Sequence, residues 1–499
     1  MKVSFTRSLL RLRLTVFWLL STLLSGCTSL YFHDAGAAPA PVRYSLKDWP
    51  YQEYWTGLVF NGSKIGFAHL TLETDPGSDE TTIHSEAALR FRLLGYDKRV
   101  NLRTTDRVGS DLRLLSLEYD QQMDASRLRL RGEMRDGRLH LTTESGGQIW
   151  QRTLDPEGPL YPVGVVNLYP VLHGLEPGRD YRYLVFDGET RSIAEVEQRV
   201  LAYETSELFE GPAYRLETSL HGQKVTTWID ARGLPQFELS LNGVLIAALE
   251  PAERARDYLL KAALIKDDTL LHYSRIPVQP PLESARDSRR MKLLLEGIDA
   301  QRLGGLDAPG QECRVVEDLD VLCSIRRIGP GSGSAGAAGP EDLASTLAIP
   351  SGSTRIRRLA EEITAGAGEP TEAIRRILDW MSDNLEQAAA DSFSALDVLD
   401  HRKAECQGHS FLYASLARAR GIPTRVVNGL VYHPDYQGFL YHTWAESLLQ
   451  GSWVPVDPTF RQLGADATHV RLLVGEDLAD LLPLLDVIGS VKVQVLELE

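Results

Sequence analysis

Positive charge is scarce in this 499-residue chain, which carries 53 lysine and arginine residues against 68 aspartate and glutamate residues. A protein with this acidic balance should repel nucleic acid and gain nothing from anionic lipid surfaces. The composition is neither collagen-like nor strongly disordered, and no internal repeat with a period of about 20–50 residues is present. With 43% hydrophobic and 24% charged residues, the sequence instead predicts two or three globular domains that bury proper cores.

The first residues have the pattern of a secretory signal. Basic residues up to Arg13 precede an apolar run over residues 14–24, which is too short to span a bilayer but fits a signal-peptide core. The run ends in Leu24-Ser25-Gly26-Cys27, which resembles the lipobox of bacterial lipoproteins. That resemblance implies a signal peptide over residues 1–26, cleavage before Cys27, and acylation of Cys27 with diacylglyceryl and palmitate-type chains. An uncleaved anchor and an ordinary secretory signal with a chance cysteine are the alternatives.

The same resemblance implies a location for the mature protein. Thr28 follows the cysteine in place of the aspartate associated with inner-membrane retention, which favours the outer membrane. Removal of residues 1–26 would leave 49 basic against 68 acidic residues, so membrane attachment would have to come from the lipid. We therefore expect a lipid-anchored protein on the periplasmic face of a bacterial membrane.

The four cysteines divide into three groups. Cys27 is assigned to the lipid, and Cys406 lies in the motif described below. Cys313 and Cys323 flank a segment that could fold back as a hairpin, so an oxidising periplasm would favour a disulfide between them, with two buried thiols as the alternative. The disulfide would leave Cys406 as the unmodified, unpaired thiol of the mature protein.

The chain divides by composition and periodicity into a tether, a β-rich half and a helix-containing C-terminal part. Residues 27–48 are rich in alanine and proline and indicate a tether. Residues 49–250 alternate as half-buried strands do, with Asn61-Gly62 and Asn242-Gly243 as hairpin signals, and predict an antiparallel all-β domain that is either a half-barrel or a sandwich. A mixed α/β connecting region over 251–328 and a Gly/Ser/Ala/Pro linker over 329–340 separate it from a C-terminal domain at 341–499.

The C-terminal domain opens with helices and then presents a cysteine. One helix is expected over 354–364, and another follows Pro370 with apolar residues at helical spacing. Residues 407–420 predict a buried helix that ends at Gly421 and has Cys406 at its N-terminal edge. The positive end of the helix dipole at that position should favour the thiolate of Cys406 over the thiol.

Three strands are expected next, over 424–432, 440–449 and 453–456. If the last two form a hairpin centred between Gln450 and Gly451, His442 and Asp457 fall two residues apart on one face of the sheet. In that register Asp457 fixes the tautomer of His442, and His442 takes the proton from Cys406.

Four motifs in this order resemble the bacterial transglutaminase-like superfamily: Cys406–His409, Arg420–Arg425, His442–Glu446 and Trp453–Thr459. The resemblance covers residues 341–475 and implies a papain-like α+β core, in which a cysteine-bearing helix packs on an antiparallel sheet that holds the histidine and the aspartate. It also implies that Cys406, His442 and Asp457 are the catalytic triad. Ala404 and Gly408 depart from the family pattern, which commonly has glycine and an acidic residue there; both departures concern substrate preference.

Residues near the motif have other candidate roles. Gln407 is a candidate oxyanion donor beside the backbone N–H of Cys406, and His409 is expected to pack or to support the site from behind. Cys406 as a purely structural thiol is one alternative. A metal site formed by Cys406, His409, His433 and His442 is another, although no second close pair follows. We expect no metal and no cofactor.

The chemistry expected from the triad is attack on an amide or peptide carbonyl to form a thioester. Water would make the protein a peptidase or amidase, which is slightly favoured, whereas a second amine would make it a cross-linking transglutaminase. Envelope proteins or peptides are the expected substrates, including peptidoglycan stem peptides. A catalytically silent, lipid-tethered binding protein is the third interpretation.

Overall fold

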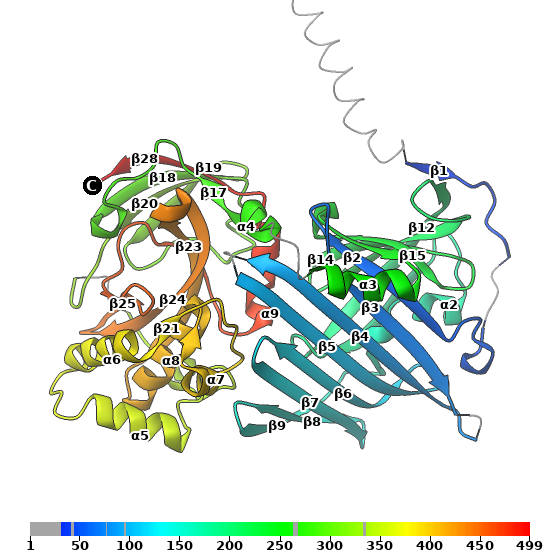
Figure 1. The fold of residues 1–499 in the computed structure, drawn as a ribbon, viewed down its shortest axis with the longest axis horizontal. Coiled ribbons are helices and arrows are strands. Elements are labelled where there is room, and N and C mark those ends of the chain that lie inside the picture. The colour runs from blue at the N-terminus through cyan, green and yellow to red at the C-terminus, as the bar shows by residue number, and fades with distance from the viewer. Residues whose placement is uncertain (1–30, 41–43, 76, 94–95, 263–267, 333–335) are drawn as a thin grey trace, which may run out of the picture.

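The protein was analysed as a computed structural model, which describes residues 31–40, 44–75, 77–93, 96–262, 268–332 and 336–499. The predicted signal peptide and the predicted lipidation site at Cys27 lie outside these residues. Figure 1 shows a large β region and a C-terminal domain lying side by side. No helix in the described ranges has the length and apolar character needed to span a membrane.

The β region is built on one 16-stranded sheet. Its strands follow the order β10-β11-β12-β13-β14-β15-β16-β2-β3-β4-β5-β6-β7-β8-β9, with β1 beside β12. Neighbouring strands are antiparallel except for the parallel pair β10 and β11. The strands are β1 (Phe32–Asp34), β2 (Glu53–Phe60), β3 (Ser63–Thr74), β4 (Glu80–Leu93), β5 (Tyr96–Gly109), β6 (Leu114–Met123), β7 (Ser126–Arg135), β8 (Arg138–Ser145), β9 (Gln148–Leu154), β10 (Leu160–Pro162), β11 (Asp180–Asp187), β12 (Ser192–Ser206), β13 (Ala213–Leu220), β14 (Gln223–Ile229), β15 (Pro235–Ser240) and β16 (Leu245–Leu249).

Local sequence explains the hairpins of this sheet. Asn61 and Gly62 both adopt positive φ, 44° and 79°, the backbone that a tight hairpin turn between β2 and β3 requires. Asn242-Gly243 likewise separates the paired strands β15 and β16, although a short 3-10 turn makes the connection. Both predicted hairpins are confirmed.

The sheet curls so that its two ends share a core. Leu72 and Val108 from β3 and β5 belong to the same buried cluster as Val185 and Leu216 from β11 and β13. A single curled sheet of this kind buries one face of alternating side chains and leaves the other polar. The predicted antiparallel all-β domain is therefore confirmed, and helix α3 (Ala252–Ala262) packs against β2 and β3 through Ala255 and Trp55.

The C-terminal domain combines helices with a second antiparallel sheet, which confirms the predicted α+β class. Its helices are α5 (Thr354–Ile363), α6 (Pro370–Asn384), α7 (Ala395–His401) and α8 (Cys406–Ala419). The sheet follows the order β26-β25-β24-β23-β27, with β17 (Ile276–Pro277) at one end of β24. Its main strands are β23 (Thr424–His433), β24 (Gly438–Leu449), β25 (Ser452–Asp457), β26 (Gln462–Leu463) and β27 (Val470–Val474).

The register of the β24–β25 hairpin decides where the candidate site residues point. Leu449 pairs with Ser452 and Ala445 pairs with Val456, which is the register that the sequence predicts. Helix α8 is buried between this sheet and the other helices, and residues from both, such as Leu412 and Val454, form one core.

The region over 251–328 does more than connect the two halves. Strands β18 (Arg290–Glu296), β19 (Gln311–Glu317) and β20 (Asp320–Arg326) form a four-stranded sheet with β28 (Lys492–Leu498), near the C-terminus, in the order β19-β20-β18-β28. Leu293 of β18 shares a core with Leu430 and Phe439 of the sheet in the C-terminal domain. The sequence suggested strands here, but pairing with a strand 200 positions away leaves no local signal.

Cys313 and Cys323 lie directly opposite each other on β19 and β20 and form a disulfide, as the sequence predicts. Cys406 is the free cysteine of the described residues. The predicted linker at 329–340 is described except for 333–335, and Gly336 N donates to Gly451 O at 2.9 Å.

The β region contacts the C-terminal domain next to the segment that leads to Cys406. Lys98 Nζ is buried and lies 2.9 Å from Asp391 Oδ2 and 3.3 Å from Asp124 Oδ2. Ser126 Oγ donates to the backbone oxygen of Asp391 at 2.8 Å, and Phe393 packs against the core of β6 to β8. Polar and apolar contacts thus hold the 391–393 segment on the β region.

The disulfide should stabilise the four-stranded sheet. Replacing Cys313 by serine should lower the free energy of unfolding by about 2–3 kcal/mol, because the unfolded chain loses a cross-link that closes a short loop. Urea denaturation followed by tryptophan fluorescence measures the loss. Reductant should destabilise the wild type by a similar amount and leave Cys313→Ser unchanged; a wild type insensitive to reductant would contradict this prediction.

Candidate active site

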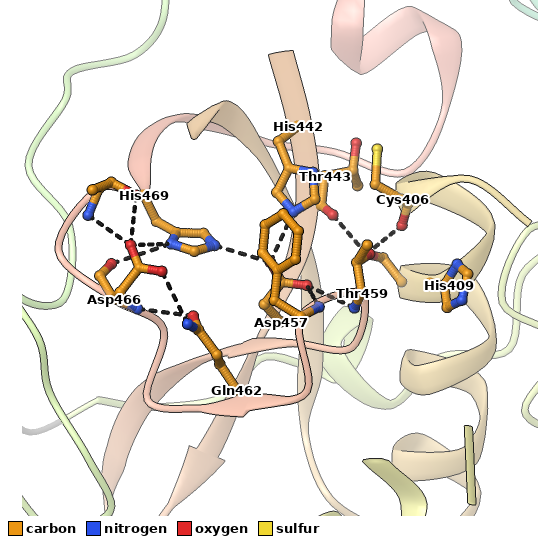
Figure 2. Close-up of polar contacts among 12 residues, drawn as sticks. Cys406, His409, His442, Thr443, Asp457, Thr459, Gln462, Asp466 and His469 are labelled. Atoms are coloured by element: carbon orange, nitrogen blue, oxygen red, sulfur yellow. Dashed lines mark hydrogen bonds and ion pairs between the residues drawn. The ribbon is translucent and has the colours of Figure 1, made fainter. Parts of the chain in front are cut away.

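Cys406 occupies the first residue of α8, one residue earlier than the sequence pattern placed the helix start. The first turn is tied to the sheet by Ser410, whose hydroxyl oxygen lies 2.9 Å from Cys406 O and 3.0 Å from Thr443 O. Thr443 follows His442 on β24. A fully buried hydroxyl therefore fixes the cysteine beside the strand that carries His442. Figure 2 shows Cys406 next to His442 and Thr443.

His442 and Asp457 are brought together by the hairpin register. His442 Nε2 lies 2.8 Å from Asp457 Oδ2, and both side chains are buried. The ring of His442 stacks on Phe460 with centroids 5.1 Å apart, which restrains its rotation. Because Asp457 engages Nε2, Nδ1 is the nitrogen left to accept a proton.

Asp457 accepts more hydrogen bonds than the sequence led us to expect. Its Oδ1 accepts the backbone N–H groups of Thr459 at 2.7 Å and Phe460 at 3.1 Å. Its Oδ2 is shared by His442 and by a second histidine, His469, whose Nε2 lies 2.9 Å away. Burial alone would raise the pKa of Asp457, but the two histidines hold that pKa well below its usual range.

His469 was missed by the sequence reasoning. It is buried, and its Nδ1 lies 3.3 Å from Asp466 Oδ1, so the ring is held between two carboxylates. Burial works to lower the pKa of His469, but the hydrogen bonds to Asp457 and Asp466 raise it to about 9. His469 is therefore charged at neutral pH and neutralises part of the charge on Asp457.

Asp466 is itself held in place by several partners. It accepts hydrogen bonds from Thr468, Gln462 and Arg286, the last at 3.2 Å from Oδ2. Figure 2 shows His469 and Asp466 on one side of His442 and Cys406 on the other. The sequence signal that could have found this pair is an aspartate and a histidine three residues apart, directly before a buried strand.

The surroundings of Cys406 contradict the predicted effect of the helix dipole. Glu405 caps α8, and its carboxylate accepts the N–H groups of Gln407 at 2.8 Å and Gly408 at 2.9 Å. Burial and the adjacent Glu405 carboxylate raise the pKa of Cys406 well above its ordinary value. The sequence reasoning failed because the helix N-terminus that should favour a thiolate is already occupied by a carboxylate.

The remaining predicted residues have simpler surroundings. Gln407 is half-buried, and its backbone N–H is used by Glu405. His409 is buried with Nδ1 2.9 Å from Glu405 O, and burial lowers its pKa, in agreement with a packing role.

The structure does not gather the alternative metal quartet of Cys406, His409, His433 and His442. Across the described ranges, the group with metal-compatible spacing is His442, Asp457 and His469, whose donor atoms all lie within 4.8 Å of one another. The two hydrogen bonds to Asp457 Oδ2 account for that spacing without an ion.

This arrangement defines a class. A half-buried cysteine at the start of a buried helix, beside a sheet that carries a histidine paired with an aspartate, is the arrangement of a cysteine-enzyme fold. Residues 357–458 match the family described as the transglutaminase-like superfamily, so this part of the chain is a transglutaminase-like domain. The matched range contains Cys406, His442 and Asp457, whereas Asp466 and His469 lie beyond it.

Solved structures from several bacteria match parts of this chain. A candidate cysteine protease from Cytophaga hutchinsonii is 15% identical, with 42% of this chain and 89% of that chain covered and a TM-score of 0.29. A β-barrel-like protein with a domain of unknown function from Brucella abortus is 10% identical, with 40% and 95% covered and a TM-score of 0.31. A candidate protease from Parabacteroides distasonis is 12% identical, with 76% and 63% covered and a TM-score of 0.19. No curated protein matches this sequence.

The charge on His469 should make stability depend on pH. Its pKa is raised on folding, so its contribution is fully present below the unfolded pKa of about 6.5 and is lost as pH rises through about 9. Replacing His469 by glutamine should remove a contribution on the order of 3 kcal/mol near pH 6 and flatten the decline above pH 7. Urea denaturation at pH 6, 8 and 10 measures both effects.

The control for this variant is His401→Gln, which replaces an exposed histidine of α7. It should follow the wild-type curve at all three pH values. If His469→Gln also follows the wild-type curve, His469 is not charged in the folded protein.

Proposed function

We propose that this protein is a cysteine acyl-transfer enzyme that acts on amide or peptide carbonyls. The observation that carries the proposal is the 2.8 Å contact between His442 Nε2 and Asp457 Oδ2, on strands packed against the helix that starts at Cys406. A carboxylate on Nε2 orients the ring and stabilises its charged form when Nδ1 receives a proton. A cysteine with a purely structural role would not require this pair.

The proposed reaction uses the three residues in two stages. Cys406 Sγ attacks the carbonyl carbon while its proton passes to His442 Nδ1, and the carbonyl oxygen becomes an oxyanion. The backbone N–H of Cys406 and the side chain of Gln407 are our candidate donors to that oxyanion. The C–N bond then breaks, the leaving amine takes the proton from His442, and a thioester remains on Cys406.

The second stage decides between two products. In hydrolysis, water attacks the thioester and gives a proton to His442, which returns it to the departing sulfur and releases a carboxylic acid. In transamidation, a second amine takes the place of water and a new amide forms. We favour hydrolysis because water is always available at the site and needs no binding pocket of its own.

The location that we propose follows from the lipobox resemblance at Cys27. Acylation there would place the enzyme on the periplasmic face of a bacterial membrane, with the outer membrane favoured, where proteins, peptides and peptidoglycan stem peptides are available as substrates. The protein carries no excess of positive charge that could bind it to a membrane surface by itself.

Activity should depend on the triad. We expect the full-length protein to act on casein supplied with a fluorescent primary amine in water enriched in ¹⁸O. Incorporation of ¹⁸O into new carboxyl groups reports hydrolysis, and covalent fluorescence reports transamidation. Cys406→Ala should abolish both signals, and His442→Ala should lower the rate by about 10²–10⁴-fold because the general base is lost.

The variant His401→Gln serves as a control and should retain the wild-type rate. Activity that survives in Cys406→Ala would rule out the proposed nucleophile. If the wild type does not modify casein but does modify the envelope proteins of its own bacterium, the substrate class is narrower than casein-like proteins. The proposed mechanism would be unaffected by that result.

Lipidation should depend on one cysteine. Cys27→Ser should prevent acylation and move the protein from the membrane fraction to the soluble or uncleaved precursor fraction. Metabolic labelling with an alkyne-bearing palmitate measures the attachment. A Cys27→Ser protein that still incorporates the label would contradict the lipoprotein proposal.

A further inference from the structure

The carboxylate of Glu405 contacts the sulfur that the proposed reaction uses. Cys406 Sγ lies 3.2 Å from Glu405 Oε2, so the thiol donates a hydrogen bond to the residue that precedes it. The same carboxylate accepts two backbone N–H groups of the first helical turn, which fixes its position. In the described part of the chain, no hydrogen bond joins this sulfur to the ring of His442.

The carboxylates around Cys406 disfavour a thiolate in the resting site. The Glu405 carboxylate contacts the sulfur, and Asp457, at the end of β25, is a second negative charge that raises the pKa of Cys406. Asp391, from the segment that precedes α7, pairs with Lys98 of β5 and acts on Glu405 and not on the sulfur. Burial and Asp391 raise the pKa of Glu405, and the two backbone N–H groups that Glu405 accepts lower it. The two histidines nearest the sulfur in the sequence motifs are His442, whose Nε2 is engaged by Asp457, and His409, whose pKa burial lowers.

We infer that Glu405 is a further catalytic residue, which keeps Cys406 as the neutral thiol until a carbonyl is bound. The inference rests on the proposed function, because it concerns the nucleophile of that reaction. A sulfur that carried a full negative charge beside Glu405 would be repelled by it and would lose the hydrogen bond that the thiol donates.

The repulsion by Glu405 is relieved during the reaction itself. As the Sγ–C bond forms, the Sγ–H proton moves to His442 Nδ1 and the negative charge moves to the carbonyl oxygen. The sulfur of the tetrahedral adduct is then uncharged, so Glu405 does not oppose it. The carboxylate therefore suppresses reactions that need a free thiolate, such as alkylation and oxidation, more than it suppresses attack on a bound amide.

The test is the pH dependence of Cys406 alkylation in the full-length protein. Iodoacetamide labels each protein between pH 5 and 11, and peptide mapping gives the rate at Cys406. In the wild type, the pH at which the alkylation rate of Cys406 is half-maximal (the midpoint) should lie above the pKa of about 8.5 of an ordinary thiol. Glu405→Gln removes the charge, so its midpoint should fall by at least one pH unit, and alkylation at pH 7 should become about tenfold faster.

A second variant separates charge from helix capping. Glu405→Ser retains a side chain that caps helices well but carries no charge, so its midpoint should fall as in Glu405→Gln even if either variant is less stable. Asp391→Asn removes a nearby carboxylate that does not touch the sulfur, so its midpoint should stay above that of either Glu405 variant. Circular dichroism confirms that each variant is folded.

A wild-type midpoint at or below about 8.5, or an unchanged midpoint in both Glu405 variants, would overturn the inference. Alkylation requires no turnover, so this outcome is distinct from failure of the proposed function. If the midpoint falls as expected but Cys406→Ala retains activity on casein, Glu405 controls the thiol and the proposed reaction is wrong.

Discussion

The buried carboxylate of Asp457 is the constraint on which the site depends. It has no exposure to solvent, and it accepts hydrogen bonds from two backbone N–H groups and from two histidine rings. A buried charge with fewer partners would cost several kcal/mol, so these contacts are needed for Asp457 to remain ionised. They also join three segments, because His442 lies on β24, Asp457 ends β25, and His469 lies in the turn before β27. Fixing one carboxylate therefore fixes the orientation of the ring that faces Cys406.

The same contacts set the charge balance of the resting site. His469 supplies a positive charge to Asp457 from behind, which balances part of the charge of that buried carboxylate. On the other side, the carboxylate of Glu405 lies 3.2 Å from the sulfur of Cys406. The Glu405 carboxylate therefore favours the neutral thiol of Cys406. Under the reaction that we propose, the nucleophile forms as the carbonyl is attacked and is not present beforehand.

The sequence predicted the parts of the structure that depend on local pattern. The helix of Cys406 ends where Gly421 and Pro423 indicate, and the turn at Gln450-Gly451 determines the register that brings His442 to Asp457. What it could not predict are contacts that depend on the folding of distant or irregular segments. The turn that holds His469 has no periodicity, so nothing in the sequence directs its ring to the carboxylate. Glu405 was visible in the motif, but its effect follows from burial and from the direction of its side chain, which a sequence does not state.

The strands of residues 290–326 and the contact between Lys98 and Asp391 bear on how this chain can be divided. A fragment that began after the linker would contain Cys406, His442, Asp457 and His469 but would lack Arg286, which contacts Asp466. It would also leave β28 without its partner β18, uncover Leu430 and Phe439, and deprive Asp391 of its buried counter-charge. An unpaired strand beside newly exposed apolar side chains is a site of aggregation. The boundary of sequence similarity is thus not a boundary of autonomous folding, and in this protein the transglutaminase-like domain packs with strands contributed from before the linker.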